Sequence, residues 1–294
     1  MLCTSCASKQ KHELSVLHLN IWMDATVVDH GFDAVVDEIV RVDPDIVMLS
    51  EADNRDGVLI VPRFIEALQK KGKDYFGESS SLDVALLSKY PLSEQTENIP
   101  HKDRVIRTRL DVKGKQVVVY TGHLDYTHYA CYLPRGYSGV TWKKLDAPVT
   151  DVTEIEKANS ESLRDESIRL VIEDAKKQQA DFIILGGDFN EPSHLDWTEE
   201  TKEMWDHNGT VVHWDCSTLL YEAGFRDAYR VKYPDPVTHP GFTFPSDNPD
   251  MPVERLTWAP EADERDRIDF IYYMPAAGWE VNEAVVVGPK SSIV

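Results

Sequence analysis

Residues 183–192 combine a short apolar run with side chains that can do chemistry. The sequence Ile-Ile-Leu-Gly-Gly-Asp-Phe-Asn-Glu-Pro predicts a buried strand that breaks at two glycines and exposes Asp188 and Asn190. In extended backbone, residues at i and i+2 share a face. A carboxylate beside a neutral amide can orient and deprotonate a water while donating to a phosphoryl oxygen. An Asx turn is the alternative, and it explains the Asp and the Asn but not the glycines and proline around them.

Glu51 and Asn20 follow two other predicted strands. Residues 14–21 alternate apolar and polar side chains, and residues 45–50 form an apolar run after a predicted helix. A right-handed β-α-β crossover brings the ends of such strands to one edge of a sheet. Glu51 offers a hard oxygen ligand that suits Mg²⁺, with Mn²⁺ as an alternative cation. A solvated glutamate after a strand is the alternative interpretation.

Two more polar side chains belong to apolar strands. His123 ends the strand of residues 117–123 and can donate to a phosphate oxygen, although a lone histidine at a strand end is more often a structural donor. Asp269 interrupts an apolar strand, and a buried carboxylate needs a partner. It either pairs with Arg267 or orients a catalytic histidine, as a carboxylate does in hydrolase triads.

The remaining patterns predict the elements that position these side chains. Hairpins, β-α-β units and amphipathic helices alternate along the chain, which indicates an α/β fold of layered sheets with helices outside. The predicted helices cover residues 32–40, 62–71, 160–179 and 217–223. The further predicted strands cover residues 83–88, 105–112, 116–121, 181–186, 267–273 and 279–287.

Residues 126–157 show no sustained periodicity and predict a long irregular insertion. Loops of this length usually carry function, and this one directly follows His123. Aromatic rings with one arginine can embrace the non-phosphate part of a ligand, so Tyr132 and Arg135 are candidate substrate contacts. Packing of the rings onto the rest of the domain explains the same residues equally well.

The net charge and the length of the apolar runs limit which kinds of molecule the protein can bind. The chain has 31 Lys and Arg against 51 Asp and Glu, a formal charge of −20, which argues against a stable complex with nucleic acid. A metal-dependent enzyme can still hold an anionic substrate through a local cation. The apolar runs are far shorter than the ~20 residues that cross a bilayer. We expect a monomer without a transmembrane segment.

The first 12 residues differ in character from the rest of the chain. Small residues around Cys6 precede Lys9, a pattern that resembles the end of a bacterial lipoprotein signal and favours a secreted or lipid-anchored protein. A frayed polar terminus is the alternative. We expect residues 1–12 to be flexible and residues 13–294 to form one domain.

Six motifs in order resemble the endonuclease/exonuclease/phosphatase superfamily, and the likeness runs over essentially the whole chain. Each motif alone is weak, but six in this order are specific. The resemblance implies a four-layer α/β sandwich, with two packed mixed sheets flanked by helices, that cleaves phosphoester bonds. The motifs are His18-Leu-Asn20-Ile-Trp, Pro44-Asp-Ile-Val-Met-Leu-Ser-Glu51, Ala85-Leu-Leu-Ser-Lys-Tyr-Pro91-Leu, Tyr120-Thr-Gly-His123-Leu-Asp125, Gly187-Asp188-Phe-Asn190 and Arg267-Ile-Asp269-Phe-Ile.

The resemblance also implies roles for individual side chains. Glu51 would be the Mg²⁺ ligand, with Asn20 beside both the metal and the phosphate. His123 would contact the phosphate of a phosphoester substrate. Asp188 and Asn190 would position the attacking water.

The sequence departs from the family pattern at its C-terminal end. In the family, the counterpart of Asp269 supports a histidine from a Ser-Asp-His type motif in the last strand, and this sequence reaches Val294 without one. We therefore expect the domain to lack its last strand. The predicted function is an Mg²⁺-dependent phosphoesterase that attacks phosphorus with water. A non-catalytic ligand-binding module on the same sandwich is the alternative, which the missing histidine favours and the retained polar set opposes.

Overall fold

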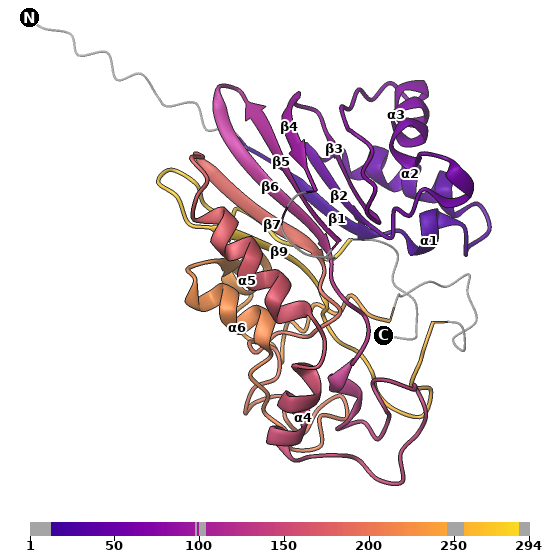
Figure 1. Cartoon of the computed structure of the whole chain (residues 1–294), viewed down its shortest axis with the longest axis vertical. Helices are drawn as coiled ribbons and strands as arrows, with labels where there is room; N and C mark the ends of the chain where they lie inside the picture. Colours follow the sequence, from indigo (N-terminus) through magenta and orange to yellow (C-terminus); the bar gives the residue numbers. More distant parts are fainter. Residues whose placement is uncertain (1–12, 98, 100–103, 246–255, 288–294) are drawn as a thin grey trace, which may run out of the picture.

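Two β-sheets packed face to face form the centre of the molecule. The structure is a computed structural model, and it describes residues 13–97, 99, 104–245 and 256–287. One sheet has three strands in the order β1-β2-β3, and the other has six in the order β4-β5-β6-β7-β9-β8. Helices lie on the outer side of each sheet, so the order of layers is helix, sheet, sheet, helix (Figure 1). The predicted α/β sandwich is confirmed.

The three-stranded sheet begins with the predicted β-α-β unit. β1 (Val16–Asn20) pairs in parallel with β2 (Ile46–Ser50), and β3 (Val84–Ser88) pairs with β2 in the antiparallel direction. Apolar side chains at helical spacing bury one face of each of the two longer helices that cover this sheet, at residues 31–42 and 60–70. The helices are α1 (Trp22–Ala25), α2 (Gly31–Val42), the 3₁₀ turn η1 (Arg55–Gly57) and α3 (Ile60–Lys70).

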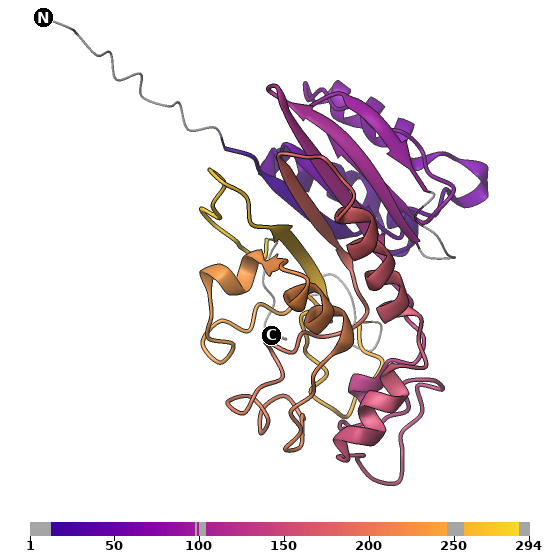
Figure 2. The ribbon, with the colours of Figure 1, turned by 60° about the vertical axis from the view of Figure 1, so that its left-hand side comes forward.

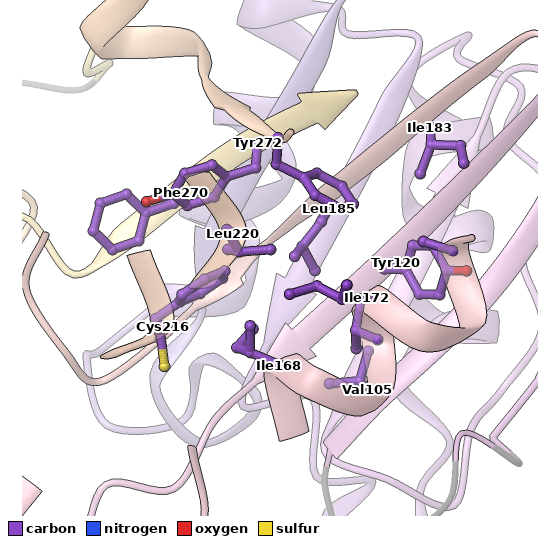
Figure 3. Packing of buried hydrophobic residues seen from close by; sticks show 14 of the residues in the cluster. Val105, Tyr120, Ile168, Ile172, Ile183, Leu185, Cys216, Leu220, Phe270 and Tyr272 are labelled. Carbon is purple, nitrogen blue, oxygen red and sulfur yellow. The ribbon is translucent and has the colours of Figure 1, made fainter. Parts of the chain in front are cut away.

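The six-stranded sheet is covered by α5 (Arg164–Ala175) and α6 (Asp215–Glu222), whose position on its outer side is clearest in Figure 2. Figure 3 shows Ile168 and Ile172 of α5 packed toward Leu185, which belongs to strand β7 of this sheet. The strands are β4 (Leu92–Thr96), β5 (Arg104–Val112), β6 (Lys115–His123), β7 (Phe182–Asp188), β8 (Arg226–Asp227) and β9 (Asp269–Met274), with α7 (Ala228–Lys232) after β8.

The glycine pair before Asp188 lets the two sheets and two strands approach closely. A Cβ atom added to Gly186 would lie 2.3 Å from the Met48 Cε atom of the opposite sheet. One added to Gly187, which has φ +153°, would lie 1.9 Å from the carbonyl oxygen of Gly122. Gly187 therefore requires glycine, because the backbone of Gly122 cannot move aside, whereas a side chain at position 186 would displace the flexible end of Met48.

Two predicted segments differ from the structure. The insertion at residues 126–157 is not wholly irregular, because it contains the 3₁₀ turn η2 (Ala130–Tyr132) and most of α4 (Val152–Asn159), which Asp151 caps by accepting from the backbone N–H of Thr153. Residues 279–287 form no strand, although their valines suggested one. A β-rich sequence needs a neighbouring strand for its hydrogen bonds, and no pairing is found for the part of this segment that the structure describes. The strands β4 and β8 and helix α7 were not predicted, being short and partly polar.

Arg135 and Tyr132 anchor the insertion instead of facing solvent. The Arg135 side chain is fully buried and donates from Nη1 to Asp266 Oδ2 at 2.5 Å and from Nε to the carbonyl oxygen of Asp263 at 2.9 Å. Tyr132 is fully buried and donates to the carboxylate of Glu264. These contacts favour the packing alternative for Arg135. Tyr132 also lines the cavity of the candidate site, so its contact with substrate stays a prediction.

Replacing Arg135 by methionine should destabilise the protein by roughly 3–5 kcal/mol, because it leaves the buried carboxylate of Asp266 without its cation. The free energy of unfolding in urea measures this effect. Lys144→Met is the matched control, since Lys144 pairs with Glu261 at the exposed surface and its loss should change stability little. Equal stability of R135M and the wild type would contradict the anchoring role.

The predictions for residues 1–12, including Cys6, and for residues 288–294 lie outside the described residues. In the part that is described, no helix combines the length and apolarity that a membrane span requires.

Candidate active site

The amide group of Asn20 joins two carboxylates from different sheets. Asn20 ends β1, Glu51 follows β2, and Asp188 ends β7. The Asn20 Nδ2 atom donates to Glu51 Oε1 at 3.0 Å and to Asp188 Oδ2 at 2.9 Å. The structure therefore brings these three predicted site residues together where the edges of the two sheets meet.

Backbone N–H groups after β1 fix the Asn20 and Glu51 side chains. Trp22 N–H donates to Asn20 Oδ1 and Met23 N–H donates to Glu51 Oε2, both at 2.9 Å. These donors are available because Trp22 and Met23 have φ angles of +45° and +58° and turn the chain sharply. Glu51 also has a positive φ, +58°, and such strained residues cluster at functional sites.

Asp188 and Asn190 do not share one extended face, because the strand ends at Asp188 and Asn190 has φ +49°. The predicted i, i+2 geometry is wrong. Asn190 N–H instead donates to Asp188 Oδ1 at 2.8 Å, which is the Asx geometry that was the alternative. The Asn190 side chain donates to the carbonyl oxygen of Leu124 at 3.0 Å and so connects β7 to the chain after His123. Both residues still line the same cavity as Asn20.

His123 lies in this cavity, and Asp83 fixes its ring. The His123 Nδ1 atom lies 2.8 Å from Asp83 Oδ2, and both side chains are largely buried. Burial disfavours the imidazolium form, but the hydrogen bond to Asp83 and the charges of Asp188 and Glu51 outweigh it and raise the pKa of His123 above its ordinary value. A protonated His123 is a suitable donor to an anionic oxygen.

Asp83→Asn should lower the pKa of His123, because burial then acts with less opposing charge. A raised folded-state pKa stabilises the fold below the ordinary value, and this contribution is lost as the pH rises through the folded-state pKa. The stability deficit of D83N should therefore be larger below pH 6.5 than well above it. An NMR titration of the His123 ring and thermal unfolding at several pH values measure both effects. Asp53→Asn, which removes the partner of Arg55, is the charge-matched control, and an unchanged His123 pKa in D83N would contradict the assignment.

Asp269 pairs with a histidine and not with its neighbour Arg267. Arg267 is buried and bonded to Asp196 and Asp227, so the predicted alternative of an Arg267 pair is wrong. The Asp269 Oδ1 atom lies 3.3 Å from His18 Nδ1. Burial, then the charge of Asp188, raises the pKa of Asp269 well above its ordinary value.

The site carries an excess of negative charge that a cation would relieve. Four carboxyl groups line the cavity around Asn20 and His123, namely those of Glu51, Asp83, Asp188 and Asp269. Carboxylate and amide oxygens are the ligands that Mg²⁺ prefers, and Mg²⁺ usually keeps several waters and takes only one or two carboxylates. Among the described residues, no group of three or more His, Cys, Asp or Glu side chains is arranged so that it could hold a metal ion. Glu51 is the side chain that would hold Mg²⁺ or Mn²⁺. The predicted role of Asn20 as a second ligand is not supported, because its Nδ2 donates to Glu51 and Asp188 while its Oδ1 accepts from Trp22 N–H.

Aromatic side chains border the same cavity. Tyr126, three residues after His123, is 50% exposed, and Trp258 is 54% exposed and contacts Trp142. On the opposite side, Thr243 Oγ1 accepts from the backbone N–H of Asp269 at 3.2 Å and so ties the Phe-rich segment around it to the carboxylates.

Lysine and arginine are scarce around this part of the cavity. Among the described lining residues, Arg55 pairs with Asp53 and Arg267 is buried in its own network. Lys113 and Lys115 lie at the turn between β5 and β6, at the opposite end of β6 from the site.

Sequence reasoning did not assign a role to three residues of the site. Asp83 directly precedes an apolar strand, just as Glu51 directly follows one. A carboxylate next to a buried strand is the sequence signal that could have identified Asp83 as a site residue. His18 belongs to the first of the six family motifs, but its partner Asp269 lies 251 positions further along the chain. Ser50 ends a buried strand, where a serine usually signals only the end of the strand.

Fold and site together define a class of protein, an α/β sandwich whose carboxylates, amides and histidine gather where two mixed sheets meet. Residues 17–291 match the endonuclease/exonuclease/phosphatase family, and the chain belongs to it. The proteins of this family are phosphoester hydrolases.

The chain is also similar to individual proteins. An uncharacterized Caenorhabditis elegans protein, F14F9.5, is 28% identical over 282 residues, covering 93% of this chain and 83% of that protein. A family protein from Leptotrichia buccalis has a similar structure, with a TM-score of 0.51, 14% identity and coverage of 89% and 88% of the two chains. Danio rerio TDP2 in complex with a single-stranded DNA product gives a TM-score of 0.52, with 15% identity and coverage of 91% and 86%. These structural likenesses concern the fold alone.

Proposed function

We propose that this protein is a Mg²⁺-dependent phosphoesterase that hydrolyses a phosphoester by in-line attack of water. One observation carries the proposal: the Asn20 amide holds the carboxylates of Glu51 and Asp188 together beside His123. A non-catalytic binding module would not need a base, a hard metal ligand and a histidine fixed by Asp83 in one cavity.

The proposed reaction uses each side chain at a stated atom. Asp188 accepts a proton from the attacking water, whose oxygen forms the new bond to phosphorus while the ester P–O bond breaks. The Asn190 N–H holds the Asp188 carboxylate for this step. His123 donates a hydrogen bond to a phosphoryl oxygen, and the leaving alkoxide takes up a proton from solvent water to become the alcohol. When bound, Mg²⁺ supplies Lewis-acid stabilisation of the charge on the phosphoryl oxygens.

The surroundings of the cavity favour a compact substrate over a polyanion. A nucleic acid presents many phosphates, which proteins bind through clusters of Lys and Arg. Near the site, the described part of this cavity is lined instead by carboxylates and aromatic rings, and its arginines are already paired, while Lys113 and Lys115 line its far end. We propose a small-molecule or lipid head-group phosphoester whose non-phosphate part contacts the aromatic border.

A panel of phosphate esters with Mg²⁺ and with chelator tests the function. The panel consists of a bis-aryl phosphate, inositol phosphates, sphingomyelin and DNA. We expect hydrolysis that depends on Mg²⁺, is abolished by chelator, and is faster for a compact ester than for DNA. Turnover that survives chelation would contradict the metal requirement. Binding of one of these esters without any hydrolysis would favour the binding module.

A further inference from the structure

His18 lies in the middle of β1, between the two sheets and two residues before Asn20 of the site. Its side chain is only 5% exposed, and both ring nitrogens face polar atoms on other strands. The Nδ1 atom lies 3.3 Å from Asp269 Oδ1 on β9, and the Nε2 atom lies 3.0 Å from Ser50 Oγ on β2. A histidine in an apolar interface is expensive unless its nitrogens are partnered, so these contacts fix the ring.

Ser50 shows which nitrogen of His18 donates. The fully buried Ser50 hydroxyl donates its one hydrogen to the carbonyl oxygen of Gly122 at 2.9 Å. Its oxygen then acts only as an acceptor, from the Asp188 N–H at 3.3 Å and from His18. His18 must therefore carry a hydrogen on Nε2.

The opposite side of the ring faces a carboxyl group. With Nε2 protonated, a neutral His18 has a bare Nδ1, and a bare nitrogen beside an ionised carboxylate would be repulsive. A hydrogen on Nδ1 or on the carboxyl group of Asp269 removes this repulsion, and the separation of 3.3 Å makes the contact a close polar pair without the geometry of an aligned hydrogen bond. His18 thus connects Asp269 on one side to Ser50, and through it to the Asp188 backbone, on the other.

The pairing of β7 with β9 explains why Asp269 needs a polar partner such as His18. Asp188 and Asp269 are directly opposite each other on the adjacent strands β7 and β9. Two ionised carboxylates so placed would repel each other, and the charge of Asp188 is, after burial, the second cause that raises the pKa of Asp269. His18 gives the Asp269 carboxyl group a polar partner on β1, in the opposite sheet.

We propose that His18 is a positioning residue of the hydrolytic site, holding the carboxyl group of Asp269 directly and the backbone of Asp188 through Ser50. The inference rests on the proposed function for its effect on catalysis. His18 supplies, from the first strand, the histidine partner of Asp269 within the described chain. It does not touch the substrate.

The first experiment compares variants of His18 in the full chain. His18→Phe keeps a ring but removes both contacts and should lower kcat by about 10–100-fold, the usual effect of losing an outer-shell residue that positions a hydrolytic site, with little change in KM. His18→Asn retains a polar group near Nδ1, and His18→Gln retains one near Nε2. Each should recover part of the kcat that H18F loses.

His194→Phe is the matched control, because His194 also makes a hydrogen bond to a buried serine, Ser217, at 2.9 Å but does so outside the cavity. It should leave kcat unchanged at temperatures where it is folded. An unchanged kcat in H18F, or an equal loss in H194F, would overturn the proposal, as would recovery in H18N and H18Q that follows only their melting temperatures.

A double-mutant cycle separates this inference from the proposed function. If His18 holds Asp269, the melting temperature of H18F/D269N should equal that of the less stable single variant, because each change removes the same contact. Additive losses would overturn the contact. If the wild type hydrolyses no ester of the panel, the proposed function fails, and the thermal cycle still decides whether His18 and Asp269 are coupled.

Discussion

Asp188→Asn should lower kcat by about 10²–10⁴-fold, the usual contribution of a positioned general base. The substitution removes the proton acceptor and also places an amide against the Asn20 amide, which now donates to Asp188 Oδ2. The measurement is kcat on the best ester of the panel at saturating Mg²⁺, with thermal unfolding to show that the variant is folded.

Asp181→Asn is the control for Asp188→Asn. Asp181 immediately precedes the same strand at its other end, where it accepts from the backbone N–H of Gln116 and pairs with Lys115 at the surface. Its replacement should leave kcat unchanged. If D188N and D181N were equally active, Asp188 would not be the base, and the attacking water would have to be activated by another group.

Glu51→Gln should weaken Mg²⁺ binding by at least about 100-fold. Changing a residue that merely orients a ligand costs 10–100-fold in metal affinity, and Glu51 is proposed to be a ligand itself. The glutamine can still accept from Asn20 Nδ2 or from Met23 N–H, so the fold should be retained. Calorimetric titration with Mg²⁺ measures the affinity without relying on activity.

Glu66→Gln provides the comparison for Glu51→Gln, since Glu66 is an exposed residue of α3 that pairs only with Lys70. Its Mg²⁺ affinity should equal that of the wild type. A glutamine at position 51 that binds Mg²⁺ as tightly as glutamate would remove Glu51 from the metal site, while a rate that falls without loss of affinity would assign it to another step.

The elements that the sequence predicted correctly are those with a strong periodic signal. The helix over residues 32–40 and the strands on either side carry apolar residues at the spacing that burial requires, and the structure has α2 between β1 and β2. Residues 279–287 carry the same kind of residues but form no strand. Whether a strand forms depends on a neighbour that local composition cannot indicate.

The candidate site could be predicted as a set of residues but not as a set of contacts. Asn20, Glu51 and Asp188 could be predicted because each lies at the carboxyl end of a strand. The carboxyl ends of neighbouring strands place their side chains close together. The partners of charged groups could not be predicted in this way. Arg135 was expected at the substrate and is bonded to Asp266, 131 positions away, since the pairing of a buried charge depends on which loops meet in the folded chain.

The contact between Met48 and Gly186 makes the spacing of the two sheets a determinant of the site. Asn20 belongs to one sheet and Asp188 to the other, and their hydrogen bond spans the interface that Met48 fills. Protein N–H···O hydrogen bonds lie within about 2.7–3.2 Å, and a contact of about 3.6 Å is no longer one. A bulkier or smaller side chain at position 48 would therefore change the spacing of the two sheets. The proposed base and metal ligand would move apart or closer together and the reaction rate would change, although Met48 touches no substrate and every catalytic residue is still present.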